Sequence, residues 1–200
     1  YLTLRAKSSR SMPQILSALQ EGTIETGRVP EVADWIARTG SADDLGALFD
    51  LNVNADTPPF PQAAALQALV DAASLRKIQP SGDKERITGF LTPVSNDDVF
   101  ALAATLAGRW KIASARPLLE EAFRQAGRNA AALEGLRLLG GQPTVAFLEG
   151  IANDTGESFR LRSLAVIGRA KMNPKAGAAL ALGVLRETPD GRDPHGIFDA

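Results

Sequence analysis

The side chains that carry acid–base and metal chemistry are scarce in this sequence of 200 residues. It contains no Cys and a single His, His195, which follows a run of Asp, Gly, Arg and Pro residues typical of a loop. A loop His can act as a general base, but an exposed His without a catalytic role is more common. Without Cys, this chain excludes disulfides, thiol catalysis and zinc ribbons. We therefore expect no cofactor, no metal site and no catalytic residue.

Paired carboxylates are the next candidates for chemistry. They occur at Asp43-Asp44, Asp97-Asp98 and Glu120-Glu121. Acidic residues in the first turn of a helix are stabilised by its dipole, so solvated helix starts explain such pairs better than acid–base dyads. The stretch 52–56 alternates Asn and Asp oxygens as a calcium loop does, but it lacks the central Gly and the closing Glu. These carboxylates predict helix starts and not a reaction centre.

A group of cations in the second half of the sequence could form a binding surface. Its members are Arg160, Arg162, Arg169 and Lys171, with Arg109, Lys111 and Arg137 at equivalent places on earlier helices. If those helices line a concave face, the group predicts a basic stripe that holds an acidic peptide, a phosphate or a polysaccharide. The alternative is a solvated helix face whose Arg stems cover apolar surface. Aromatic residues make up 6% of the sequence, so we expect no nucleic-acid binding.

The elements that position these groups are predicted to be helices. Ala and Leu dominate an apolar share of 44%, a mixture that favours helix over strand. The net charge is −1, although residues 1–100 carry 9 Lys and Arg against 13 Asp and Glu, and residues 101–200 carry 13 against 10. No apolar run reaches the roughly 20 residues of a membrane helix, so we expect no membrane span in this region.

Short breaks separate these helical patterns at a regular interval. Many segments begin near Ser or Pro and end near Gly, as Ser41, Pro30 and Pro174 illustrate. The predicted helix ends are Gly40, Gly108, Gly140 and Gly168, with Ala73 in the place between the first two. Their average spacing of about 32 residues is typical of stacked helical pairs, each of which needs neighbours to bury its faces.

The segment 148–168 resembles a HEAT repeat. The matching residues are Leu148, Ile151, Asp154, Phe159, Arg160, Leu164, Ile167 and Gly168. The resemblance implies that Asp154 and Arg160 take the family's structural role in a hydrogen-bonded ladder between repeats. The repeat 28 residues upstream has Ala126 and Ala132 in their place, so the other repeats are degenerate.

Two stretches, 35–68 and 188–194, are similar to a narrower group within this family. They resemble the HEAT region of large bacterial secreted or membrane-associated proteins. In that group such a region links a dehydrogenase-like β-propeller to a c-type haem domain. The resemblance implies that redox chemistry lies outside this chain, and that the chain is periplasmic or otherwise extracytoplasmic.

These patterns together predict an all-α protein, a right-handed α-α superhelix of about five HEAT-like hairpins. We expect an N-terminal helix within 1–29 that completes an upstream element, a repeat array over 30–188, and a loop or linker over 189–200. The predicted function is a non-catalytic scaffold or spacer within a longer protein, with a protein partner or neighbouring domains. The alternatives are a structural region of a membrane-associated dehydrogenase with a haem domain, and a basic groove for anionic polymers.

Overall fold

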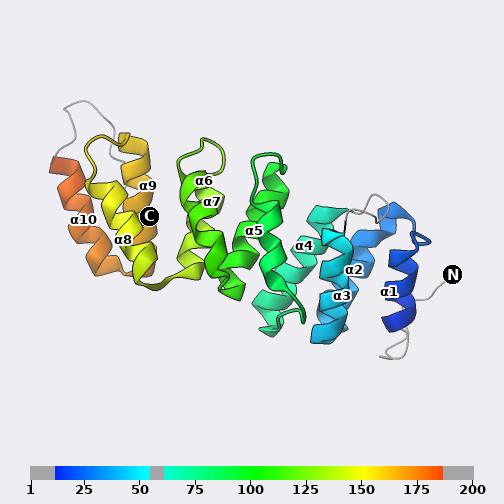
Figure 1. Ribbon diagram of the computed structural model, residues 1–200. Helices are drawn as coiled ribbons and strands as arrows, with labels where there is room; N and C mark the ends of the chain where they lie inside the picture. Colours follow the sequence, from blue (N-terminus) through cyan, green and yellow to red (C-terminus); the bar gives the residue numbers. More distant parts are fainter. Residues whose placement is uncertain (1–11, 55–60, 187–200) are drawn as a thin grey trace. The chain divides into compact units, whose positions relative to one another are not determined.

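The computed structural model describes residues 12–54 and 61–186 (Figure 1). Every regular element in these ranges is helical, which confirms the all-α prediction, and no strand occurs within them. The α-helices are α1 (Met12–Gln20), α2 (Val29–Thr39), α3 (Ala42–Val53), α4 (Gln62–Asp71), α5 (Asp97–Trp110), α6 (Arg116–Phe123), α7 (Asn129–Leu139), α8 (Gly141–Asn153), α9 (Phe159–Met172) and α10 (Pro174–Arg186). His195, the start of the 1–29 segment and the expected linker 189–200 lie outside the described residues.

Shorter helical turns connect some of these helices. The turns η2 (Thr26–Arg28), η4 (Lys84–Phe90) and η5 (Ala113–Ala115) are 3-10 helices, and η3 (Ala72–Arg76) is a π-helix that prolongs α4. The π-helix ends at Lys77, a non-glycine residue with a φ of 57°. A left-handed residue turns the chain sharply away from the helix axis, so α4 stops there although the sequence contains no glycine at that point.

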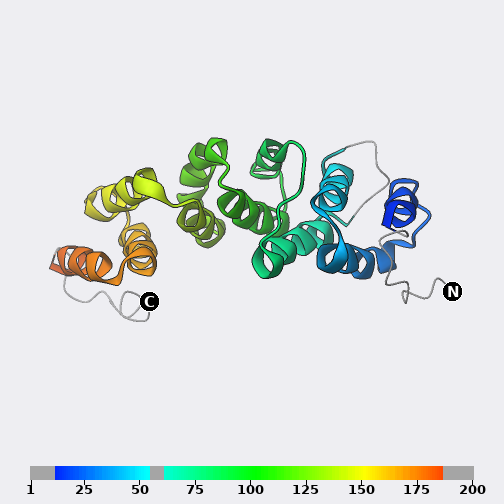
Figure 2. The same cartoon turned by 90° about the horizontal axis from the view of Figure 1, so that it is seen from below.

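The chain divides into two compact units, Tyr1–Leu106 and Ala107–Ala200. In the first unit, α1 packs against α3 and α2 packs against α4, while α3 also contacts α2 and α4. These contacts place α1 and α3 in one layer and α2 and α4 in a second layer (Figure 2). Each layer is filled by alternate helices of the chain.

The second unit has the same alternation. Helix α7 packs against α6 and α9, and α9 packs against α8 and α10. Helix α8 also contacts α7 and α10, so alternate helices again lie beside each other (Figure 1). The two units are therefore built on one local rule, in which helices two apart in the chain pack against each other. These pairs are α1 with α3 and α2 with α4 in the first unit, and α7 with α9 and α8 with α10 in the second.

The helix starts follow from side-chain caps that the sequence predicts. Ser41 precedes α3, and its hydroxyl accepts a hydrogen bond from the Asp44 N–H while the Asp44 carboxylate accepts one from the Ser41 N–H. This reciprocal capping box satisfies donors that a helix start leaves without partners. Pro30 lies in the first turn of α2 and Pro174 begins α10, as their fixed φ favours.

Two of the glycines predicted to end helices have a different role. Gly40 follows α2 and Gly140, with a φ of 67°, follows α7, as predicted. Gly108 and Gly168, however, lie inside α5 and α9, so the prediction that they end helices was wrong. A Cβ on Gly108 would lie 2.6 Å from the Leu138 Cβ of α7, and a Cβ on Gly168 would collide with Leu133. These glycines let helices approach closely.

The core of each unit is apolar. The largest fully buried side chains of the first unit include Phe49, Phe100 and Leu66, and those of the second are Phe123, Leu119 and Leu136. Leu164, predicted to face inward, is only half-buried in α9, whereas Leu161 and Ala165 are buried.

Candidate functional site

Arg162 was predicted to belong to an exposed basic stripe, but the structure buries it. Its relative exposure is 7%, and its Nε donates a hydrogen bond of 2.8 Å to the Ala152 carbonyl at the end of α8. The last carbonyls of a helix have no partner inside the helix, so a guanidinium there satisfies an acceptor that would otherwise be buried alone. The prediction that Arg162 belongs to an exposed basic stripe is thus wrong, because its side chain is buried and hydrogen-bonded to the end of α8.

Two further members of the predicted stripe are paired with carboxylates. Arg137 on α7 donates to both oxygens of Glu134, at 2.8 and 2.6 Å, and this hydrogen bonding raises the pKa of Arg137 above its usual value. Arg169 on α9 donates to Glu149 on α8 at 2.8 Å, with 13% of its side chain exposed. Both cations therefore have their charge compensated within the chain.

The remaining predicted members differ in exposure. Arg109 is half-buried at the end of α5, and its Nε is buried with no hydrogen-bond partner. Arg160 and Lys171 are exposed on α9, and the ion pairs found among residues 12–54 and 61–186 do not include them. Only these two of the seven predicted cations present a free charged head to solvent in the described part of the chain.

The structure places the two predicted ladder residues, Asp154 and Arg160, in different surroundings. Asp154 follows α8, and its Oδ1 accepts a hydrogen bond of 2.9 Å from the Gly156 N–H. Arg160 is exposed in the first turn of α9. Arg162, two residues further along α9, donates a hydrogen bond to the end of α8, and Arg169 donates another to Glu149 of α8. The ladder role of Asp154 and Arg160 stays a prediction.

Cations that cap the ends of other helices form a recurrent feature that sequence reasoning missed. Arg76 donates from Nη1 to the Ala37 carbonyl and from Nη2 to the Gly40 carbonyl, each at 2.7 Å, at the end of α2. Arg116 donates to the Gly140 carbonyl at 3.1 Å and to the Thr144 hydroxyl at 2.6 Å. Each cation lies outside the helix whose end it caps. The only sequence signal is a cation close to a helix boundary, which is too common to be diagnostic.

Lys111 combines this capping role with an unusual backbone conformation. It follows α5 with a φ of 61°, and the Ile112 N–H donates a 2.9 Å hydrogen bond to the Ala107 carbonyl. The Lys111 N–H donates to the Gly108 carbonyl, which completes a Schellman motif. From there the Lys111 Nζ donates to the Leu138 carbonyl of α7. The left-handed turn therefore places the Lys111 ammonium at the end of α7.

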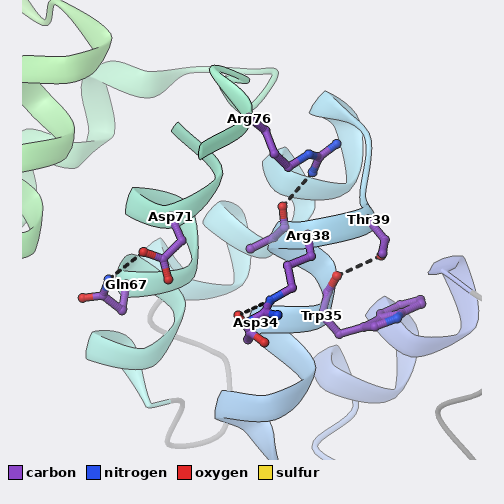
Figure 3. A network of polar contacts seen from close by, with 8 residues as sticks. Asp34, Trp35, Arg38, Thr39, Gln67, Asp71 and Arg76 are labelled. Atoms are coloured by element: carbon purple, nitrogen blue, oxygen red, sulfur yellow. Dashed lines mark hydrogen bonds and ion pairs between the residues drawn. The ribbon is translucent and has the colours of Figure 1, made fainter. Parts of the chain in front are cut away.

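A polar network covers the surface where α2 lies beside α4 (Figure 3). On α2 the Arg38 Nε donates to Asp34 at 2.9 Å, and on α4 the Gln67 Nε2 donates to Asp71 at 3.0 Å. Both contacts join residues four apart on one helix, as expected for solvated faces. Arg76 lies at the end of the same surface, where it caps α2.

The carboxylates gather into no reaction centre within the described residues. Asp44 belongs to the capping box, and Asp97 and Asp98 lie in the first turn of α5. In residues 12–54 and 61–186, no group of three or more His, Asp or Glu side chains could hold a metal ion. The arrangement can therefore hold helix ends together and present polar faces. Residues 55–56 of the Asn- and Asp-containing stretch 52–56 lie outside the described residues.

None of the helices described is both long and apolar enough to cross a membrane. With the fold and these contacts established, comparison with known proteins adds no name: no family model, no characterised protein and no solved structure matches this chain.

Proposed function

We propose that the chain is a non-catalytic scaffold, a HEAT-like α-solenoid that binds a protein partner or holds neighbouring domains apart. The observation that supports it most strongly is the local packing rule, in which α1 packs against α3, α2 against α4, α7 against α9 and α8 against α10. Hairpins stacked in this way have extended faces, and such faces serve other solenoids as binding surfaces.

The use of the charged residues supports the same proposal. Arg76, Arg116 and Arg162 cap helix ends, and Arg137 and Arg169 pair with carboxylates. Contacts of this kind fix one hairpin against another. A binding scaffold requires such a rigid stack, whereas a catalytic site requires polar groups that converge on one point.

Small-angle X-ray scattering of the purified chain tests the solenoid. A compact protein of this length has a radius of gyration of roughly 16 Å, and a stack of hairpins in one direction exceeds that value clearly. A radius of gyration at the compact value, with the helical content retained, would contradict the solenoid.

Reconstitution tests the binding function. Chemical cross-linking in the source cells identifies candidate partners, and each candidate is purified and mixed with the full chain. We expect a complex of fixed stoichiometry by size-exclusion chromatography with light scattering. Turnover of a small molecule by the chain, with no candidate forming a complex, would overturn the proposal.

A further inference from the structure

The last two described helices repeat one pattern of cationic and apolar residues. On α9, Arg160, Leu164, Ile167 and Lys171 follow each other at intervals of four, three and four residues. On α10, Lys175, Ala179, Leu182 and Arg186 have the same intervals. Positions at these intervals share one face of a helix. Each helix therefore carries an apolar centre with a cation on either side, about three turns apart.

The stripe on α10, Lys175-Ala179-Leu182-Arg186, is the more open of the two. Leu182 is 57% exposed and the other three residues are exposed, whereas Leu164 and Ile167 on α9 are half-buried. The opposite side of α10 packs against α8 and α9, where a Cβ on Gly177 would collide with Ala170. Helix α10 is thus held firmly by one side and presents the stripe to solvent on the other.

The charges around this stripe lack counterions. Residues 158–186 contain six Lys and Arg and no Asp or Glu. Arg162 and Arg169 are used by internal contacts, and the other four cations have no ion pair among the residues that the structure describes. Some cations elsewhere have acidic partners, as Arg38 has Asp34 and Arg86 has Asp50. Within residues 12–54 and 61–186, α9 and α10 therefore carry positive charge without acidic partners for these four cations.

We propose that the α10 stripe binds an amphipathic helix of a partner protein, in which two carboxylates flank an apolar centre. Leu182 would contact the apolar centre while Lys175 and Arg186 pair with the carboxylates, because complementary charge on either side of an apolar contact fixes both register and orientation. This inference rests on the proposed scaffold function and names the chemistry of the partner.

The probe is a labelled helical peptide with two Glu residues about three turns apart and two Leu residues between them. Fluorescence anisotropy measures its binding to the full chain. We expect Lys175→Glu with Arg186→Glu to weaken binding by about tenfold or more, and added salt to weaken the wild-type complex. The matched control, Arg160→Glu with Lys171→Glu, makes the same change of charge on the less open stripe and should alter affinity by about twofold at most.

Two further arms make the outcome decisive. A peptide with Lys in place of Glu should bind the Lys175→Glu, Arg186→Glu protein, and Leu182→Ser should weaken binding of the original peptide without reducing helical content. Equal loss in the control variant, or no binding of the original peptide, would overturn the inference. The inference would be overturned in favour of a membrane surface by the following result. The wild-type protein binds no peptide but cosediments with phosphatidylserine-containing vesicles, and the Lys175→Glu, Arg186→Glu protein does not cosediment. If a partner complex still forms with the Lys175→Glu, Arg186→Glu protein, the binding role of the α10 stripe is wrong, but the proposed scaffold function is unaffected.

Discussion

The two units share a packing rule and both bury large side chains, but their glycines are used differently. Fully buried rings occur in each, such as Phe49 in the first unit and Phe123 in the second. In the second unit Gly108 of α5 lies against another helix, α7, whereas in the first unit Gly46 of α3 lies against the loop residue Ser81. Large side chains stabilise through buried area, while glycine contacts stabilise through close fit of backbones. The comparison teaches that close helix contacts at glycine add to a core of large side chains in the second unit and do not replace it.

The largest expected effect on stability comes from removing a large buried side chain of the first unit. Phe49→Ala should lower the free energy of unfolding by about 3 to 5 kcal/mol, because it removes a fully buried ring and leaves a cavity. Urea denaturation followed by circular dichroism measures this change. Leu75→Ala is the control, since Leu75 is 79% exposed and should alter stability by less than about 0.5 kcal/mol. A similar loss in both variants would contradict the assignment of the core.

The next effect comes from filling the close contact of the second unit. Gly108→Ala should destabilise the protein by about 1 to 3 kcal/mol, because the new Cβ would lie 2.5 Å from the Gly135 carbonyl oxygen. Gly150→Ala is a matched control in α8, where a Cβ meets nothing within 4 Å. There the intrinsic preference for Ala should stabilise the helix by up to about 1 kcal/mol. A lower melting temperature for Gly108→Ala and a higher one for Gly150→Ala would support the close contact at Gly108. Changes of the same sign in both variants would contradict it.

A third prediction concerns the buried guanidinium of the second unit. Arg162→Met should cost about 1.5 to 3 kcal/mol, since the Ala152 carbonyl loses a charge-assisted hydrogen bond while the apolar volume is kept. Arg160→Met, two residues earlier and exposed, should change stability by less than about 0.5 kcal/mol. Chemical denaturation of both variants provides the measurement. A larger loss for Arg160 would restore the ladder role that the HEAT resemblance implies.

The smallest effect is expected on the polar surface of the first unit. Arg38→Ala removes an ion pair with Asp34 in which the two side chains are 72% and 45% exposed. Such a pair contributes about 0.3 to 0.5 kcal/mol and is weakened by salt. The melting temperature should hardly move at high salt. A loss comparable to that of Arg162→Met would mean that this surface, too, depends on its cations.

Much of the fold could be predicted from the sequence because helix boundaries depend on local chemistry. Ser41 and Pro30 mark starts, and Gly140 marks an end, in agreement with the structure. The interior glycines could not be assigned in this way, since a glycine that ends a helix and one that admits a neighbouring helix look identical in sequence. Gly108 therefore required the position of α7, which is a tertiary contact.

The candidate surface was harder to predict than the fold. The sequence shows a group of cations, but the burial of Arg162 and the pairing of Arg169 depend on where α8 ends and which of its side chains face α9. The equal spacing on α9 and α10 is visible in the sequence alone. Whether this spacing marks a surface that a partner can reach depends on the exposure of the apolar residues. Leu182 is exposed, whereas Leu164 and Ile167 are half-buried.

The cations that cap helix ends have a consequence for how the protein opens. Fraying normally starts at the terminal turn of a helix and needs no other element to move. At α2 that turn is tied to Arg76, and at α7 to Lys111 and Arg116, all of which lie outside the helix whose end they cap. The last amides of α2 and α7 should consequently exchange with deuterium as slowly as those in the middle of each helix, because releasing them requires these contacts from other segments to break.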